Sequence, residues 1–180
     1  MAAKAKAKAQ RSLKSRALQL LAQRDQSRLE LKRKLLRHAR SGDAETPSTD
    51  DDPPADHQSE VEALLDWLEA NRFLSDDRFV DSRVHAREAR FGNLRIRNEL
   101  AQHGVAVPAD LARALDQTEL ARAAAVRERR FRSLPSDAAD RAAQSRFLAG
   151  RGFSADVVHR LMRQLRERSA TLGTDRQPGD

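Results

Sequence analysis

The sequence contains no cysteine, no tyrosine and only one tryptophan in 180 residues. Without cysteine the chain cannot form a disulfide framework or a thiolate metal site. Its five histidines are scattered, and none stands beside another at the spacing of paired metal ligands: they are His38, His57, His85, His103 and His159. We therefore expect no metal ion and no cofactor.

Long apolar runs are also missing. No segment approaches the ~18 consecutive apolar residues that a membrane-spanning helix needs, so we expect no membrane insertion. The chain begins Met-Ala-Ala-Lys-Ala-Lys-Ala-Lys, which is basic but lacks the apolar stretch of a secretory signal. These absences favour a cytoplasmic protein.

Sequence signatures of catalysis are absent. No Gly-x-x-x-x-Gly-Lys-Ser/Thr loop, Gly-x-Gly-x-x-Gly turn or Gly-x-Ser-x-Gly elbow occurs. Asp76 and Asp77 are adjacent carboxylates, but they stand in the first turn of an expected helix, where nothing removes them from water. We therefore expect a protein that is not an enzyme.

Aromatic residues are few: six phenylalanines and one tryptophan. Proteins that bind single-stranded nucleic acid commonly stack bases on exposed rings. Here the rings mostly fall at apolar helical positions, which favours a place in the core. If DNA is bound, we expect mainly phosphate contacts from arginine and lysine.

Charge, by contrast, is abundant and unevenly distributed. The net charge is +7, but residues 1–40 carry 13 Lys+Arg against 2 Asp+Glu, and residues 41–60 carry 7 Asp+Glu with no Lys or Arg. A basic start followed by an acidic segment indicates contact with a polyanion, or with a protein bound to one. The alternative is that an arginine- and alanine-rich genome raised the arginine content without functional demand.

Two stretches of the sequence share one pattern. In residues 96–105 and 144–153 a helix-like run ends in Leu-x-x-x-Gly, an apolar residue follows, and a second helix-like run begins within a few residues. A looser copy lies around 35–39. Such repeats indicate a stack of small helical units, which form extended binding surfaces more often than catalytic clefts. Since valine, isoleucine and threonine never form a period-two run, we expect an all-α protein.

We predict three tandem three-helix repeats that form an elongated, curved helical array of nine helices. The sixth helix should begin at Pro108 and the seventh at Leu120. The predicted organisation is a disordered basic N-terminal arm at 1–11, repeat 1 at 12–74 with a flexible acidic insertion at 41–59, repeat 2 at 75–118, repeat 3 at 119–168 and a frayed tail at 169–180.

Local signals support several of these helices. Ser27 followed by Glu30 fits a capping box at a helix start. Gly104 and Gly152 should adopt left-handed backbone conformations at helix ends. We also expect Leu94 to lie on the buried face of the fifth helix.

Two motifs carry a family resemblance. Residues 71–79 read Asn-Arg-Phe-Leu-Ser-Asp-Asp-Arg-Phe, and residues 90–105 place Gly92 before an Ile-x-x-Glu-Leu helix that closes with Gly-Val. Residues 17–31 are similar to the first-repeat signature of the same family. In order and spacing these motifs resemble the RecX family, bacterial regulators of the RecA recombinase, over roughly residues 13–165.

The resemblance implies a three-repeat all-α protein without catalytic activity of its own. It also implies that the RecA–DNA filament is the partner. Proteins of this family lie in the filament groove, lower its ATPase and strand-exchange activities, and limit its growth.

Candidate contact residues come from the middle of the chain, where arginines recur on one helix face. We expect these side chains to contact filament protein or DNA phosphates, although a solvated arginine face explains the spacing equally well. They are Arg83, Arg87, Arg90, Arg95 and Arg97.

Two other functions remain open from the residues alone. One is a stand-alone DNA-binding helical protein, transcriptional or architectural, in which the helix near Asn93 carries Arg95, Arg97 and Asn98 to the DNA. The other is a helical adaptor for a different acidic partner. In each case we expect a monomer.

Overall fold

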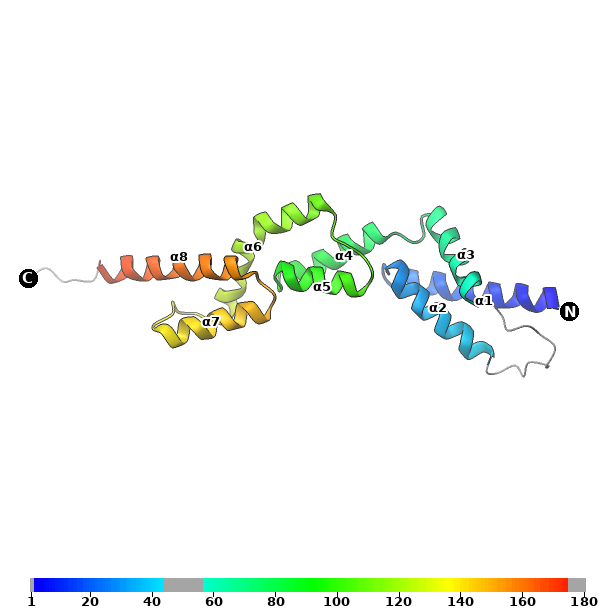
Figure 1. Cartoon of the computed structure of the whole chain (residues 1–180), viewed down its shortest axis with the longest axis horizontal. Coiled ribbons are helices and arrows are strands. Elements are labelled where there is room, and N and C mark those ends of the chain that lie inside the picture. The colour runs from blue at the N-terminus through cyan, green and yellow to red at the C-terminus, as the bar shows by residue number, and fades with distance from the viewer. Residues whose placement is uncertain (1, 44–56, 175–180) are drawn as a thin grey trace, which may run out of the picture. The chain divides into compact units, whose positions relative to one another are not determined.

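The computed structural model describes residues 2–43 and 57–174, with side chains placed within 13–40 and 57–171. Over these residues the chain forms eight helices and no strand (Figure 1). The all-α class predicted from the sequence is therefore confirmed. The helices are α1 (Ala2–Gln23), α2 (Arg28–Asp43), α3 (His57–Ala70), α4 (Asp76–Glu88), α5 (Asn93–Gln102), α6 (Ala109–Arg130), α7 (Ala138–Gly150) and α8 (Ala155–Thr174).

The chain divides into two compact units. Unit 1 contains the residues up to Ser82 together with His103–Val105, and unit 2 contains Arg83–Gln102 and the residues from Ala106 onward. Unit 1 thus holds α1 to α3 and the first half of α4, whereas unit 2 holds the rest of α4 and α5 to α8. The three repeats, their boundaries and the curved array stay predictions.

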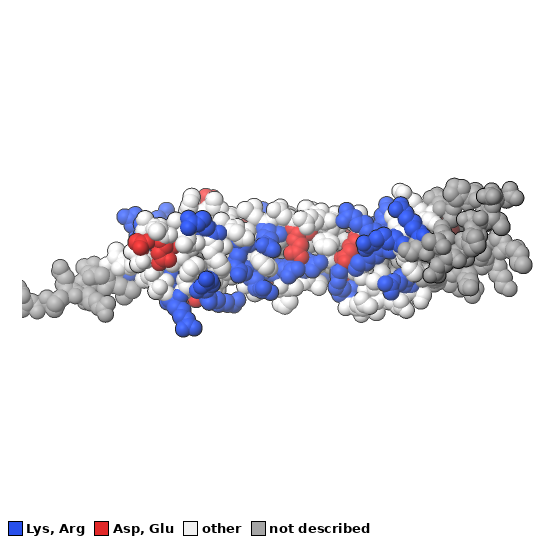
Figure 2. Space-filling model, turned by 90° about the horizontal axis from the view of Figure 1, so that it is seen from below, with Lys and Arg blue, Asp and Glu red and all other residues white. Residues whose placement is uncertain are grey.

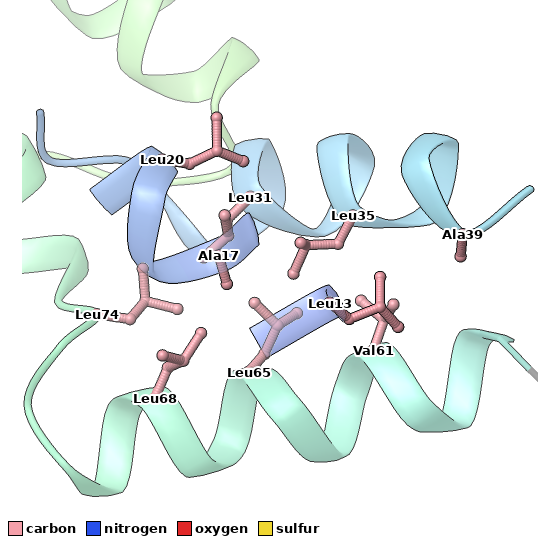
Figure 3. Close-up of a cluster of buried hydrophobic side chains, with 10 residues drawn as sticks. All are labelled: Leu13, Ala17, Leu20, Leu31, Leu35, Ala39, Val61, Leu65, Leu68 and Leu74. Carbon is pink, nitrogen blue, oxygen red and sulfur yellow. The ribbon is translucent and has the colours of Figure 1, made fainter. Parts of the chain in front are cut away.

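The core of unit 1 lies between α1, α2 and α3. Its apolar side chains recur at spacings of three and four along each helix, which places them on one face. Figure 3 shows these side chains gathered between the three helices, with Leu74 coming from the segment after α3. The buried set is Leu13, Ala17, Leu20, Leu31, Leu35, Ala39, Val61, Leu65, Leu68 and Leu74.

The start of α2 is fixed by the predicted cap. The Ser27 hydroxyl accepts the backbone N–H of Glu30 at 3.1 Å and donates to the backbone carbonyl of His103 at 2.8 Å. The backbone N–H of Arg28 donates to a carboxylate oxygen of Asp76 at 2.8 Å. The adjacent Ser27 and the distant Asp76 therefore each accept one free N–H group of this helix end.

A row of ion pairs joins α2 to α3. The Arg28 guanidinium contacts Glu62, Asp66 and Glu69 at 2.8, 2.7 and 2.7 Å, and Lys32 also pairs with Glu62. Hydrogen bonds from Lys32 and Arg28 lower the pKa of Glu62. One face of the basic helix α2 is thereby neutralised within unit 1.

The core of unit 2 is built by α6, α7 and α8. Helix α8 supplies most of it, at the three- and four-residue spacing that the sequence displays. The turn before α8 adds a fully buried phenylalanine. The buried set is Ala123, Val126, Leu148, Phe153, Val157, Val158, Leu161, Met162 and Leu165.

The prediction of nine helices is wrong at one place in the described residues. The expected sixth and seventh helices are one continuous helix, α6, of 22 residues. No glycine or proline stands between Leu115 and Leu120, and Asp116 to Glu119 are all compatible with a helix. The second and third predicted repeats therefore share α6.

The predicted ends also differ from the structure. Helix α1 begins at Ala2, where a disordered arm was expected, because alternating alanine and lysine are both strong helix formers. Helix α2 runs to Asp43 and α3 begins at His57, so the rest of the predicted insertion lies outside the described residues. Helix α8 continues to Thr174, beyond the expected frayed end at 169.

The glycine predictions are confirmed, with φ of +75° at Gly104 and +81° at Gly152. The burial predicted for Leu94 is wrong, because its side chain is 50% exposed. The buried face of α5 is Asn93, Ile96 and Leu100, and Leu94 lies one position away from that stripe.

Candidate binding surface

On the described part of the face drawn in Figure 2, Lys and Arg side chains cover more surface than Asp and Glu side chains. In unit 2, four arginines surround the half-buried ring of Phe91, in the turn between α4 and α5. The guanidinium carbons of Arg95, Arg90, Arg151 and Arg87 lie 4.5, 5.6, 5.9 and 6.0 Å from the ring centroid. Guanidinium groups at this range are attracted by the negative face of the ring. We call these five residues the Phe91 cluster.

The arginines around this turn differ in charge compensation. Arg87 donates to both carboxylate oxygens of Glu99 at 3.1 Å, and Arg83 reaches the same carboxylate at 3.4 Å. In the part of the chain with placed side chains, no carboxylate pairs with Arg90, Arg95 or Arg151. The cluster therefore holds three cations beside one another without an internal counter-charge.

Backbone contacts lock the two turns that carry the cluster. The N–H of Gly92 donates to the carbonyl of Arg151, and the N–H of Leu94 donates to the carbonyl of Gly152, both at 3.0 Å. A Cβ on Gly92 would overlap the backbone of Phe153. A Cβ on Gly152 would meet the Cβ of Arg95 at 2.5 Å. The absence of side chains at both glycines allows the close approach that sets the arginine spacing.

A buried carboxylate joins the helices that follow these turns. Glu119 of α6 is 4% exposed, and its Oε1 accepts the backbone N–H of Asn93 at 2.9 Å and of Ser154 at 3.3 Å. Its Oε2 accepts the Ser154 hydroxyl at 3.2 Å. One negative group thus lies at the N-termini of both α5 and α8, where the helix dipoles favour it.

Arg122 lies one turn after Glu119 on α6 and binds the turn between α4 and α5. It donates to the carbonyl oxygens of Glu88, Phe91 and Leu115 at 3.1, 2.9 and 3.0 Å, and to the Asn93 side-chain oxygen at 2.5 Å. Burial lowers the pKa of this guanidinium. Arg122 is therefore a structural arginine, whereas Arg90 and Arg95 of the same region are exposed.

A pair of aromatic rings lies next to the Phe91 cluster, on the other side of Arg151. Phe147 of α7 and Phe131 at the end of α6 meet edge to face, with ring centroids 5.3 Å apart. Arg151 lies 4.8 Å from the Phe147 centroid, so its guanidinium spans both aromatic sites. Arg130 lies 5.4 Å from Phe131. Alternating guanidinium and ring groups are typical of surfaces that bind anionic or protein partners.

The five arginines predicted as contacts differ in whether a carboxylate of the described residues pairs with them, and Arg87 has such a partner although it belongs to the Phe91 cluster. Arg83 and Arg87 pair with Glu99, and Arg97 pairs with Asp116 at 3.0 Å. Arg90 and Arg95 stand together in the Phe91 cluster. Their part in partner binding stays a prediction.

Sequence reasoning missed Arg151 as a member of the site. No residue pattern in the sequence predicts its approach to Phe91. Arg151 precedes the glycine that closes the second Leu-x-x-x-Gly pattern, and Phe91 precedes the glycine of the α4–α5 turn. Both positions flank a glycine that permits close backbone approach.

Other kinds of site find no support in the described ranges. No group of three histidine, aspartate or glutamate side chains there could hold a metal ion. None of the helices described is long and apolar enough to cross a membrane.

Comparisons with known proteins agree on one family. The family described as "RecX, third three-helix domain" matches residues 117–162, which span the second half of α6, all of α7 and the first part of α8. The structure resembles the crystal structure of RecX from Lactobacillus salivarius, with a TM-score of 0.64 and 17% identity over 88% of this chain and 97% of that one. At this identity the likeness concerns the fold alone.

Curated relatives are closer in sequence. The Regulatory protein RecX of Ralstonia nicotianae is 46% identical over 84% of this chain and 86% of its own length. The protein of the same name from Leptothrix cholodnii is 49% identical over 86% of this chain and 89% of its own length. With this identity over most of both chains, and the family match at residues 117–162, the chain belongs to the RecX family of regulatory proteins.

Proposed function

We propose that this protein binds the RecA–DNA filament and modulates RecA, mainly by inhibiting its ATPase, strand exchange and filament growth. Membership in a family of regulatory proteins supports the regulatory part of the proposal. The partner follows from the family resemblance of the motifs at 71–79 and 90–105. DNA phosphates are the expected secondary contacts.

The observation that carries the binding part is the uncompensated charge of the Phe91 cluster. Arg90, Arg95 and Arg151 are held together by locked turns, with no carboxylate paired to them among the described residues. The three positive charges repel one another, and an anionic partner would offset this repulsion because it attracts all three. A surface preorganised in this way loses little conformational entropy on binding.

In this proposal the protein acts by binding to the filament and does not catalyse a reaction. A monomer suffices, because the cluster is complete within unit 2 of one chain. The place of action follows from the partner: a filament on chromosomal DNA lies in the bacterial cytoplasm.

The test is DNA-dependent ATP hydrolysis by preformed RecA filaments, titrated with this protein at moderate salt. We expect hydrolysis to fall at sub-stoichiometric amounts of the protein. The double charge reversal Arg90→Glu with Arg95→Glu should raise the half-inhibitory concentration at least about tenfold, because central arginines of an interface contribute above 1 kcal/mol each. Arg87 is a poorer target, since reversing it also breaks its ion pair with Glu99.

The matched control is Arg163→Glu with Arg166→Glu on the exposed side of α8. It makes the same change in net charge within the same unit. Equal loss of inhibition in the two double variants would remove the Phe91 cluster from the proposal. If hydrolysis does not change at any concentration while the protein binds naked DNA tightly, the stand-alone DNA-binding function replaces the proposed one.

A further inference from the structure

Two aromatic side chains of unit 1 lie at the surface, although large apolar rings are mostly buried in folded proteins. Trp67 of α3 is 36% exposed, and Phe73 in the turn after α3 is 47% exposed. Their ring centroids lie 5.7 Å apart with 21° between the planes, so the two rings stack. The ammonium of Lys14 on α1 lies 3.5 Å from the centroid of the Trp67 ring. We call these three residues the Trp67 patch.

Half-buried leucines extend the apolar surface of the Trp67 patch along α1 and α3. On α1, Leu18 and Leu21 follow Lys14 by four and seven residues, so the three share one face of the helix. On α3, Leu64 precedes Trp67 by three residues and shares its face. The contact between Lys14 and Trp67 shows that these two faces adjoin. The leucines pack only partly against the core of unit 1, so they form an apolar strip beside the exposed rings.

Hydrogen bonds hold the turn that carries Phe73. The Arg78 guanidinium donates to the backbone carbonyls of Arg72 and Phe73, both at 3.0 Å. The side-chain amide of Asn71 donates to the carbonyl of Trp67 at 2.8 Å. The backbone that carries the two rings is thus fixed before a partner arrives, which reduces the conformational entropy lost on binding.

The charges beside the exposed rings are positive. Among the side chains that the structure describes, no carboxylate pairs with Lys14 or with Arg72. Asp66 and Glu69 of α3 instead pair with Arg28, on the side of α3 that faces α2. A partner with carboxylates beside its apolar side chains would therefore match this surface in charge.

The geometry favours a protein segment over a nucleic-acid strand. A base stacks on a free ring face, but the Trp67 ring is already in contact with Phe73 and with Lys14. The adjoining leucines offer no stacking surface and suit the aliphatic side chains of a protein. A helix with apolar residues at spacings of three and four presents such side chains in a row, and its acidic residues lie beside that row.

We propose that the Trp67 patch binds an acidic amphipathic helix of a protein partner. Apolar side chains of that helix cover Trp67, Phe73 and the adjoining leucines, and its carboxylates meet Lys14 and Arg72. All these residues belong to unit 1. The patch shares no residue with the Phe91 cluster of unit 2, so this proposal and the filament proposal can fail separately.

The first experiment uses the unaltered full chain. Trp67 is its only tryptophan, so the intrinsic fluorescence reports this site without a label. The probe is a tryptophan-free synthetic peptide of about 18 residues, with leucines at spacings of three and four and glutamates at the remaining positions. We expect the Trp67 emission to shift to shorter wavelength and its quenching by acrylamide to fall at least about twofold, because the bound helix shields the indole from water.

The matched control peptide carries lysine at every glutamate position, and it should bind at least about tenfold more weakly. Equal responses to the two peptides would overturn the acidic character of the partner. A response of Trp67 to (dT)20 but not to the acidic peptide would assign the patch to nucleic acid and overturn the proposal. So would the absence of any response to the acidic peptide at about 1 mM, the limit of weak binding.

Charge reversal tests the part of Lys14. The affinity of the fluorescein-labelled peptides for the full chain is measured by fluorescence anisotropy. Lys14→Glu should weaken binding of the acidic peptide at least about fivefold and strengthen binding of the lysine peptide, because an attraction becomes a repulsion. Arg33→Glu is the matched control, since Arg33 is exposed on α2 and the change in net charge is the same. Equal effects of the two variants would reduce the binding to general charge attraction and overturn the proposal.

Truncation tests the part of the aromatic ring. Phe73→Ala should weaken binding of the labelled acidic peptide at least about fivefold, as expected for an aromatic anchor at the centre of an interface. Leu94→Ala removes a similarly exposed apolar side chain from unit 2 and should leave the affinity within about twofold. The measurement contains no RecA, so its result is independent of filament inhibition. Unchanged affinity in Phe73→Ala would remove the rings from the site and overturn the proposal.

Discussion

The carboxylate of Glu119 accepts the backbone N–H of Asn93 at 2.9 Å, and through this bond α6 holds the start of α5. The same side chain accepts two hydrogen bonds from Ser154 at the start of α8. Asn93 in turn is 3% exposed and donates its side-chain amide to Asp116 at 2.7 Å. The turns that carry the Phe91 cluster thus depend on one buried acid that the charge pattern did not single out.

Replacing Glu119 by alanine should destabilise the protein by about 2–4 kcal/mol, because three donors lose a charged acceptor in a buried place. Urea unfolding followed by circular dichroism measures this free energy. Glu128→Ala is the matched control, since Glu128 is an exposed acid on the same helix. The control should stay within about 0.5 kcal/mol of the parent. Similar values for the two variants would contradict the role assigned to Glu119.

Gly92→Ala should destabilise by at least about 2 kcal/mol, because the added Cβ would overlap the backbone of Phe153 and the two locked turns would have to separate. Urea unfolding followed by circular dichroism again measures the free energy of unfolding. Gly150→Ala makes the same chemical change in α7, where nothing lies within 4 Å of the new Cβ. It should be neutral or stabilise by up to about 1 kcal/mol, since alanine is the better helix former. A harmless Gly92→Ala would show that the turns are not in close contact in solution.

Arg72→Gly should stabilise unit 1 by about 0.5–1 kcal/mol. Arg72 ends α3 with φ of +59°, and the N–H of Phe73 after it bonds back to the carbonyl of Leu68 at 2.9 Å. A residue with a Cβ is strained in this left-handed position, which glycine adopts freely. Thermal unfolding measures the gain. Arg72→Ala keeps the strain and should gain nothing, so equal stabilisation by both variants would point to charge as the cause.

Acid should weaken unit 1 through Glu30. Although burial opposes its ionisation, hydrogen bonds from Arg24 and Lys34 lower the pKa of Glu30 to about 2, from the ordinary value of 4.5. A lowered folded-state pKa gives stability that is present above pH 4.5 and is lost as the pH falls toward 2. Unfolding free energies measured between these pH values should fall less steeply in Glu30→Gln. Glu128→Gln, an exposed change, should leave the slope as it is.

The sequence predicts those parts of the fold that are local. The spacing of hydrophobic residues predicted α3 and α8. The Ser27 cap predicted the start of α2, and Gly104 and Gly152 predicted the left-handed turns. Leu94 was misplaced because its hydrophobicity suggested burial, whereas the packing of α5 left it on the exposed side. The continuity of α6 was missed because the repeat pattern suggested a boundary where no helix-breaking residue stands.

The sequence predicted only part of the candidate site, because contacts between distant elements cannot be read from local spacing. Arginine spacing on a helix shows which cations share a face, and this identified Arg90 and Arg95. Arginine spacing does not show which carboxylates approach from other elements. The ion pairs of Arg87 and Arg97 therefore could not be predicted, and both residues were expected to contact a partner. Arg151 joins the cluster from a turn distant in the sequence, through backbone bonds that no residue pattern encodes.

The continuity of α6 bears on how this protein can be dissected into pieces. A fragment that begins at residue 119, the predicted start of the third repeat, would cut through the middle of a helix of 22 residues. Glu119 would then be the first residue of the fragment, where a helix frays. The fragment would also lack α5, whose Asn93 N–H donates to Glu119. The second and third predicted repeats could therefore not be exchanged as separate modules, and a fragment that keeps the Phe91 cluster must retain α4 to α8 as one piece.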